Sequence, residues 1–466
     1  MQDGGSGDAV PTDGPRPERR WRWLLLSLGV IAVIVILRLG LGALFGGTRD
    51  QQGYVQLWEY TRLGVNPYVA SKIVAWPPFW WGLVALWSAV WEFIGALIPG
   101  WTRVVSPSVF LKCLYFLFEI ALAWMLGSVL SERRQARRRP HEAGDPGDRL
   151  GLTLAFLWMP ATWTITALHG NFDVIPSFFT FAAFLVLAQR ETPGAARAAA
   201  LLLGLAVMSR TFPILFALPL AMFVWRRFGM RSALEAGFLV AGPTALSFAV
   251  LAINSPEAIE RILNYRGVIG GWWGLGGIAR LFVSDRFAID VVNWNLTIFY
   301  PLMLGLAGVV AHALWRERVG ILDAGLILVL GMFCLAPTIS LQNFYFFLPW
   351  AFWYAIDRGD SYAKLLLWLT SINLFLIYVV IPDSLVNPSW FHQAYGYAAG
   401  GLVPPLPSPD WLINLLKAYA DTFKRPGLAF GAFNQNVMRL PVWIALWVWF
   451  VRELRAYARA RRTPGS

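Results

Sequence analysis

An acidic residue stands just after the first long apolar run, at the start of a polar stretch. Residues 46–78 read GGTRDQQGYVQLWEYTRLGVNPYVASKIVAWPP, with Asp50 near their beginning. A helical-looking run, a Gly-Val-Asn-Pro-Tyr turn and a Trp-Pro-Pro segment follow it. A carboxylate at a helix exit, with an ordered loop behind it, can take a proton from an attacking hydroxyl. Asp50 is therefore the candidate catalytic base, and a solvated or helix-capping aspartate is the alternative.

Three further polar elements interrupt the apolar runs. They are His169-Gly170-Asn171-Phe172-Asp173, Ser209-Arg210-Thr211-Phe212-Pro213 and Ser340-Leu341-Gln342-Asn343-Phe344-Tyr345. Ionisable groups at membrane depth are costly and usually face an interior cavity with a partner. We therefore expect these elements to meet on one side of a membrane and to hold a lipid phosphate and a sugar. The candidate binding residues are His169, Asn171, Asp173, Arg210, Gln342, Asn343 and Tyr345, with Arg266 and Arg280 as further cations for a phosphate.

Each of these residues also has a simpler interpretation. Asp173 could cap the start of a helix, and His169 could be a structural histidine. Arg210 could extend its guanidinium to lipid headgroups. Gln342 and Asn343 could be plain interfacial polar residues.

The composition is that of a membrane protein with many spans. Of 466 residues, 57% are hydrophobic and 14% are charged, and many apolar runs approach the ~20 residues that cross a bilayer. The 25 Trp residues gather at the ends of these runs, as rings at the headgroup level do. The sequence therefore predicts an all-α polytopic membrane protein.

The charge and the two cysteines exclude several other classes. The net charge of +12 comes from short Arg clusters between apolar runs, a pattern of membrane orientation and anionic-lipid contact, not of nucleic-acid binding. Cys113 and Cys334 lie inside apolar runs, so neither a disulfide framework nor a zinc site is expected. No phosphate-binding or dinucleotide-binding glycine loop is present. We expect no metal and no cofactor.

The Arg clusters also predict the topology. If all clusters are cytoplasmic, an even number of crossings must separate them. Three apolar runs, 23–45, 77–98 and 107–130, lie between Arg22 and Arg133. We assign the non-crossing role to 77–98, which opens with two prolines, carries Glu92 and is rich in Trp. Residues 46–106 then form a first extracytoplasmic loop that contains a re-entrant or interfacial helical hairpin.

Counting the remaining runs gives about twelve transmembrane helices with both termini inside. Two short runs, 198–210 and 212–225, are expected to meet at an extracytoplasmic cavity beside Arg210. Residues 1–21 are predicted to be a disordered cytoplasmic terminus, 22–452 the transmembrane domain, 383–436 the last extracytoplasmic loop and 453–466 a basic cytoplasmic tail. The Gly/Ala/Arg bias favours a bacterial plasma membrane.

The order of these motifs resembles a known family. Over roughly residues 45–360, the chain resembles the GT-C superfamily. The motifs that carry the resemblance are, in order, Asp50, Gly-Val-Asn-Pro-Tyr, Trp-Pro-Pro, HGNFDVIP, GLAVMSRTFPILFALPLAMF and SLQNFYFFLPW. GT-C proteins are polytopic glycosyltransferases that use polyprenyl-phosphate sugars. The nearest branches are the catalytic subunit of GPI mannosyltransferase I and bacterial polyprenyl-phosphate-mannose-dependent mannosyltransferases.

The resemblance implies roles for particular residues. Asp50 matches the acidic residue that acts as general base in the first outer loop. Arg210 falls where relatives often carry Lys in a Lys-x-x-Pro pattern, a contact to the donor phosphate. Gln342 matches the Gln of a Ser-x-Gln-Tyr pattern, whereas Asn343 replaces its Tyr. An Asp-x-Asp pair of some relatives is reduced here to Asp50 alone.

The implied activity is inverting transfer of a sugar, mannose by resemblance, from a polyprenyl-phosphate donor. The acceptor would be a lipid or a glycan on the extracytoplasmic face, with membrane lipids around the protein and no nucleic-acid partner. Two other functions remain open. The chain could be a transporter of lipids or small solutes, or a non-catalytic subunit of an envelope-glycan complex.

Overall fold

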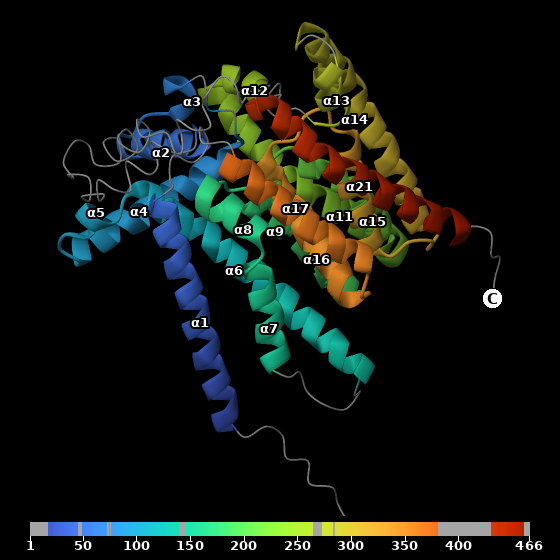
Figure 1. The fold of residues 1–466 in the computed structure, drawn as a ribbon, viewed down its shortest axis with the longest axis horizontal. Coiled ribbons are helices and arrows are strands. Elements are labelled where there is room, and N and C mark those ends of the chain that lie inside the picture. Colours follow the sequence, from blue (N-terminus) through green and yellow to red (C-terminus); the bar gives the residue numbers. More distant parts are fainter. Residues whose placement is uncertain are drawn as a thin grey trace, which may run out of the picture.

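The computed structural model describes residues 17–44, 49–71, 74, 76–138, 146–263, 273–282, 285–380 and 430–460, and this part of the chain is helical and contains no strand. The helices pack into one bundle, with α1, α6 and α7 extending from one end and α2, α3 and α12 lying at the other (Figure 1). The sequence prediction of an all-α membrane protein is confirmed.

The helices before residue 190 include the polar first loop. They are α1 Pro17–Leu44, α2 Arg49–Arg62, α3 Pro67–Ala70, α4 Pro78–Leu97, α5 Trp101–Val104, α6 Pro107–Arg138, α7 Pro146–Leu157, α8 Pro160–Thr162, the π-helix η1 Trp163–His169 and α9 Val174–Gln189. The later elements are α10 Pro193–Ser209, the 3₁₀-helix η2 Phe212–Phe216, α11 Ala217–Asn254, α12 Pro256–Leu263, α13 Gly274–Phe282, α14 Asp285–Trp315, α15 Ile321–Leu335, the 3₁₀-helix η3 Leu341–Phe346, α16 Leu348–Asp357, α17 Ser361–Val380 and α21 Phe430–Ala460.

Several of these helices are suited to a bilayer. Within the described residues, four are long and apolar enough to cross it, and they are Pro78–Leu97, Pro107–Arg137, Phe212–Asn254 and Ile289–Trp315. A fifth would be the pair Gly147–Leu157 and Pro160–His169, which is bent by 52°. In α14, Leu302 and Leu304 expose 45% and 60% of their surface, which suits contact with lipid. The chain is an integral membrane protein.

Gly229 divides α11 into two helices. Its φ of 86° and ψ of 170° are not helical. Arg197 of α10 binds Glu235 at 3.0 Å, and a Cβ on Gly204 of α10 would lie 2.7 Å from the carbonyl oxygen of Leu239. The contacting residue numbers increase in the same direction along both helices, so the second half of α11 runs parallel to α10. The break follows the apolar run 212–225 and lies among Arg226, Arg227 and Arg231.

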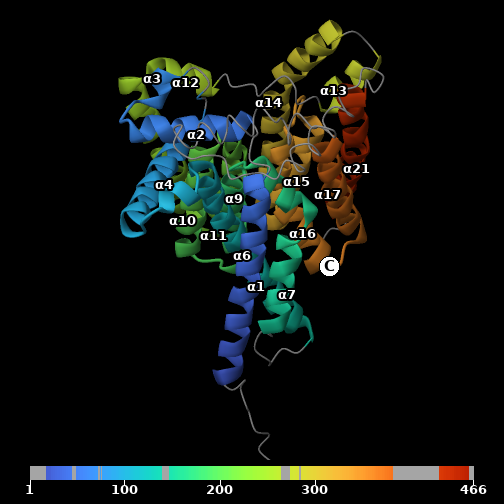
Figure 2. The ribbon, with the colours of Figure 1, turned by 60° about the vertical axis from the view of Figure 1, so that its left-hand side comes forward.

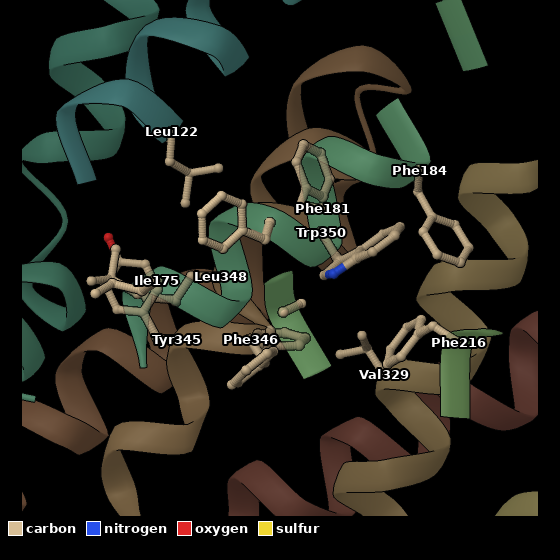
Figure 3. Packing of buried hydrophobic residues seen from close by; sticks show 14 of the residues in the cluster. Leu122, Ile175, Phe181, Phe184, Phe216, Val329, Tyr345, Phe346, Leu348 and Trp350 are labelled. Carbon is tan, nitrogen blue, oxygen red and sulfur yellow. The ribbon is translucent and has the colours of Figure 1, made fainter. Parts of the chain in front are cut away.

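Aromatic and aliphatic side chains fill the centre of the bundle. Figure 3 shows Phe181 and Phe184 of α9 around Trp350 of α16, with ring centroids 4.9 and 5.7 Å from it. Gly325 of α15 is required here, because a Cβ would lie 2.0 Å from the Trp350 ring. Aromatic pairs in edge-to-face contact add to the burial of apolar area. This core fixes the relative positions of α9, α15 and α16.

A buried ion pair joins α1 to α6. Arg38 Nη1 lies 2.5 Å from Glu119 Oε1, and the two side chains are 2% and 0% exposed. The Arg38 guanidinium also donates to Thr162 Oγ1 at 2.9 Å and to the carbonyl oxygen of Leu157. Charges at this depth are stable only when they are paired, so the pair fixes α1 against the helix break before η1.

Some predicted boundaries differ from the structure. Residues 77–98 contain no internal hairpin, because α4 is one continuous helix from Pro78 to Leu97. The non-crossing role of this segment stays a prediction. Helix α1 already begins at Pro17, within the segment 1–21 expected to be disordered, and α21 continues to Ala460, within the predicted tail. Most of the predicted loop 383–436 lies outside the described residues.

Candidate functional site

Asp50 is the meeting point of three polar segments. It lies in the first turn of α2, which crosses one end of the bundle (Figure 2). Its Oδ2 lies 3.1 Å from His169 Nε2, and it accepts hydrogen bonds from Asn171 Nδ2 at 3.1 Å and Gln342 Nε2 at 3.2 Å. Oδ1 has no partner within the described part of the chain, and the side chain is 30% exposed. The described residues thus hold Oδ2 and make no hydrogen bond to Oδ1.

The local fold explains why His169 and Asn171 point the same way. The chain leaves the π-helix η1 at His169 and turns at Gly170, which has a φ of 68°. A Cβ on Gly170 would lie 2.6 Å from Gln51 Oε1 and 2.8 Å from Lys112 Cε. Only glycine combines this left-handed conformation with such a close approach. π-helical turns occur frequently at functional sites.

A second carboxylate lies behind the first. Asp173 is fully buried, and its Oδ1 accepts a hydrogen bond from Arg210 Nε at 2.8 Å and lies 2.7 Å from Arg210 Nη2. Its Oδ2 accepts from Asn343 Nδ2 at 3.1 Å. Asp173 precedes α9 but makes no capping hydrogen bond with its side chain. The interpretation of Asp173 as a simple helix cap is therefore wrong.

The segment 340–346 places its two amides by forming a capping box. The backbone N–H of Ser340 donates to Asn343 Oδ1 at 3.1 Å, and the Ser340 side chain accepts from the backbone of Asn343. Because the Asn343 oxygen is used in this way, its NH₂ group points to Asp173. Gln342, one residue earlier, reaches Asp50. The 3₁₀-helix η3 thus contributes one donor to each carboxylate.

An aromatic layer supports the cluster from below. The Phe172 ring stacks on the Trp80 ring of α4, with centroids 4.3 Å apart and an interplanar angle of 10°. The Arg210 guanidinium also lies over the Phe172 ring, 4.8 Å from its centroid. Tyr54 packs edge-on against Phe172 at 5.4 Å. Trp80, Phe172 and Tyr54 are buried, so they support the polar groups and do not themselves form a stacking surface for a ligand.

The surroundings of Asp50 favour its ionised form. Burial alone would raise the pKa of this carboxyl, but the hydrogen bond and charge of His169, the charge of Arg210 and the Asn171 hydrogen bond outweigh burial and lower the pKa below its ordinary value. Burial raises the pKa of the Tyr54 hydroxyl well above its usual range. At neutral pH the site therefore presents a carboxylate beside a neutral phenol.

The structure brings together the predicted site residues whose side chains it describes, with the exception of Tyr345. Tyr345 is fully buried in the core, beside Ile175 and Leu348 (Figure 3), and its carbonyl oxygen accepts a hydrogen bond from Ser177 Oγ at 3.0 Å. Arg266 lies outside the described residues. Arg280 lies on α13, and its side chain is outside the described part of the structure.

Three further residues that shape the site were not predicted from the sequence. Tyr54, one helical turn after Asp50, accepts a hydrogen bond from Asn171 Nδ2 at 3.1 Å. Gln51 donates to the Ser108 carbonyl at 3.0 Å and so attaches α2 to the start of α6. Lys112, fully buried in α6, donates to the carbonyl of Ala167 at 2.8 Å within η1. A lysine inside an apolar run is itself a signal of function, and Lys112 was detectable in this way.

The arrangement suits hydroxyl groups better than anions. Among the side chains that the structure describes, two carboxylates face the guanidinium of Arg210, which lies 2.7 Å from the buried Asp173. No group of three His, Cys, Asp or Glu side chains in the described ranges could hold a metal ion. An open carboxylate oxygen accepts hydrogen bonds from sugar hydroxyls and repels a phosphate.

The comparison with known families adds a separate observation. Residues 56–265 match the family described as GPI transamidase subunit PIG-U. No curated protein matches the chain at a significant level. The matched segment contains His169, Asn171, Asp173 and Arg210, and it begins after Asp50 and ends before Gln342.

This match corrects the function expected from the sequence. The resemblance to GT-C glycosyltransferases is wrong as an assignment, because the family that matches is a transamidase subunit and not a mannosyltransferase. Three expectations inferred from that resemblance are therefore also wrong. They are the glycosyltransferase activity, the transfer of mannose and the polyprenyl-phosphate sugar donor. Over residues 56–265, the chain is similar to a GPI transamidase subunit.

Proposed function

We propose that the chain is a non-catalytic subunit of an envelope-glycan complex and that its polar cluster binds the sugar hydroxyls of a glycosylated lipid. The family matched by residues 56–265 is named as a subunit of an enzyme acting on GPI, which is a glycosylated lipid. The observation that carries the proposal is Asp50, with Oδ2 held by donors from His169, Asn171 and Gln342 and Oδ1 open.

The charge of the cluster supports a sugar ligand. A phosphate site needs uncommitted cations, whereas the Arg210 guanidinium contacts Asp173 at 2.7 Å. Amide groups and a carboxylate in fixed positions are the usual partners of neutral hydroxyls. The lipid part would remain in the bilayer beside the bundle, so that only the polar head enters the cluster.

The finer topology belongs to the same proposal. The Arg clusters favour about twelve crossings with the cluster and residues 46–106 on the extracytoplasmic face. The composition favours a bacterial plasma membrane. A glycosylated lipid in the outer leaflet would then reach Asp50 laterally, without leaving the membrane.

The test is a binding measurement on the purified full-length chain. A glycosylated phosphatidylinositol and an unglycosylated phosphatidylinositol with the same acyl chains are titrated against the wild type, Asp50→Asn and Glu92→Gln. Glu92 is the matched control, a 51% exposed carboxylate that binds Arg62 outside the cluster. We expect the glycosylated lipid to bind more tightly, and Asp50→Asn to weaken it about 10- to 100-fold, as loss of a charged hydrogen-bond acceptor does.

The control variant should bind like the wild type. Equal affinity for the two lipids, or unchanged binding by Asp50→Asn, would contradict the proposal.

A further inference from the structure

A second polar site lies at the opposite end of the bundle. A cavity of about 540 Å³ is lined by the ends of α6, α9, α16 and α21, by the part of α11 before its break at Gly229, by the turn between α14 and α15 and by the start of α15. Helix α9 begins next to Asp173 and reaches this cavity at Leu187, and at 1.5 Å per residue the two sites are about 20 Å apart. The cavity is therefore separate from the Asp50 cluster.

The inner wall of the cavity is neutralised by its own ion pairs. Asp357 is 7% exposed and lies 2.9 Å from Arg137 Nη2 and 3.5 Å from Arg133 Nη1. Asp323 binds the Arg358 guanidinium and accepts from the Tyr354 hydroxyl. Glu453, a further carboxylate of the lining, lies 2.9 Å from Arg452 Nη2. These acidic groups are each paired with a guanidinium group and hold the helix ends together.

The lining holds five arginines and five carboxylates, and the part formed by Arg226, Arg227, Glu317 and Arg318, here called the mouth, carries more positive than negative charge. Arg226 and Arg227 share Glu317 at 3.5 and 4.0 Å, and Arg227 lies 3.6 Å from Glu191. The distances in these ion pairs are long and the side chains are about half exposed to solvent, so the pairs contribute little stabilisation. Arg318 lines the same mouth, and its side chain has no ion pair or hydrogen bond with the described residues. Three guanidinium groups thus face two carboxylates.

The turn that presents Arg318 is strained. Glu317 has a φ of 54° and is the one non-glycine residue with positive φ in the described ranges. This conformation costs roughly 1–2 kcal/mol for an L-residue. Strained residues gather at ligand sites, where the surrounding structure holds them.

An aromatic pair and an apolar stripe adjoin the mouth. The Trp225 and Trp315 rings, next in sequence to Arg226 and Arg316, lie 5.2 Å apart. Leu218, seven residues before Trp225, shares its face of α11, and the two side chains are 45% and 38% exposed. Trp rings prefer the headgroup level of a membrane, and arginines bind lipid phosphates there.

We propose that this cavity binds the phosphate of a membrane phospholipid at Arg226, Arg227 and Arg318, with an acyl chain along the exposed apolar face of α11. The arginine distribution places this end of the bundle on the cytoplasmic side. A soluble phosphate compound would meet the same guanidinium groups but could not use the apolar stripe.

The chain offers a matched control for the test. The variant Arg227→Ala/Arg318→Ala removes one cavity arginine from α11 and one from the α14–α15 turn. The variant Arg231→Ala/Arg316→Ala removes one arginine from each of the same two segments, and neither of these residues lines the cavity. Arg231 is 95% exposed and lies 3.8 Å from Glu235. Both variants change the net charge equally.

Phosphatidylglycerol is titrated against the full-length proteins in detergent and counted by native mass spectrometry, with glycerol 3-phosphate as the soluble competitor. We expect the cavity variant to bind about 30-fold more weakly than the wild type, the control variant to bind within about twofold, and glycerol 3-phosphate not to compete. Equal weakening in both variants, unchanged binding in the cavity variant, or effective competition by glycerol 3-phosphate would overturn the proposal.

A measurement on the wild type alone covers the case in which the cavity variant does not fold. Because the contact is ionic, phosphatidylglycerol binding should weaken as salt concentration rises, and uncharged diacylglycerol should bind far more weakly. Salt-independent binding, or equal binding of diacylglycerol, would overturn the proposal.

Discussion

Asp50 and Asp173 lie in one cluster, yet their surroundings assign them different tasks. Asp173 is fully buried, with both oxygens bound by Arg210 and Asn343. Asp50 is partly exposed and keeps Oδ1 open among the described residues. Asp173 therefore organises the loop, and Asp50 is the carboxylate that a ligand can reach.

Asp50 should make the stability of the protein depend on acid pH. Its folded-state pKa is lowered below the unfolded value of about 3.9. Its contribution is therefore present above the unfolded pKa and is lost as pH falls through the folded pKa. Melting temperatures in detergent should show the wild type more stable than Asp50→Asn at pH 7, with the gap closing toward pH 3. A gap that stays constant or widens in acid would contradict this account.

Arg210 should matter because it neutralises a buried charge. Arg210→Ala leaves Asp173 buried without its cation, which costs about 3–5 kcal/mol of unfolding free energy. The double variant Arg210→Ala/Asp173→Asn removes the unpaired charge as well and should recover much of that loss. Chemical denaturation of the three proteins measures the recovery. If the double variant is no more stable than Arg210→Ala, the ion pair is not what makes Arg210 important.

The π-helix η1 and its glycine turn are the local element on which the cluster depends. Gly170 has a φ of 68°, and a Cβ there would approach Gln51 and Lys112 within 3 Å. Gly64 has a φ of 65° and no atom within 4 Å of such a Cβ. Gly64→Ala should therefore show the left-handed penalty alone, roughly 1–2 kcal/mol. Gly170→Ala should lose more stability in thermal melts, because Gln51 or Lys112 must also move. Equal losses would show that the crowding at Gly170 is relieved without cost.

The pairing of α1 with α6 rests on Arg38 and Glu119. Glu119→Leu leaves a buried guanidinium unpaired and should cost about 3–5 kcal/mol, whereas Arg38→Met/Glu119→Leu should cost far less. The exposed pair of Arg62 and Glu92 is the control, and Arg62→Met should change stability by about 0–1 kcal/mol. Denaturation of the four proteins in detergent compares these losses. A Glu119→Leu loss no larger than that of Arg62→Met would contradict the assigned role of the pair.

The sequence predicted which segments meet more successfully than it predicted what they do. Apolar runs and Arg clusters located the helices, and polar breaks located Asp50, His169, Asn171, Asp173, Arg210, Gln342 and Asn343. Tyr345 was misplaced because a 3₁₀-helix turns neighbouring side chains in different directions, and η3 points Asn343 to the cluster and Tyr345 to the core. Gly170 and Lys112 could not be assigned a role before the packing of η1 against α6 was known.

Function was harder to predict than position. A carboxylate in an outer loop suits both a catalytic base and a binding group, because the same oxygen accepts a hydrogen bond in either case. The motifs around Asp50 resembled those of glycosyltransferases, whereas residues 56–265 match a transamidase subunit. Arg210 is bound to Asp173, and this pairing determines the charge balance of the cluster. The pairing follows from three-dimensional contacts and cannot be predicted from the spacing of the two residues in the sequence.

The most direct test asks whether the chain binds a glycosylated lipid without changing it. The purified full-length protein is incubated with a glycosylated phosphatidylinositol carrying a labelled sugar, and both bound and free lipid are recovered and analysed by mass. The account predicts lipid retained by the protein with its sugar intact, and much less lipid retained by Asp50→Asn. Release or transfer of the labelled sugar, or no retention by the wild type, would contradict the proposal that this chain is a non-catalytic glycolipid-binding subunit.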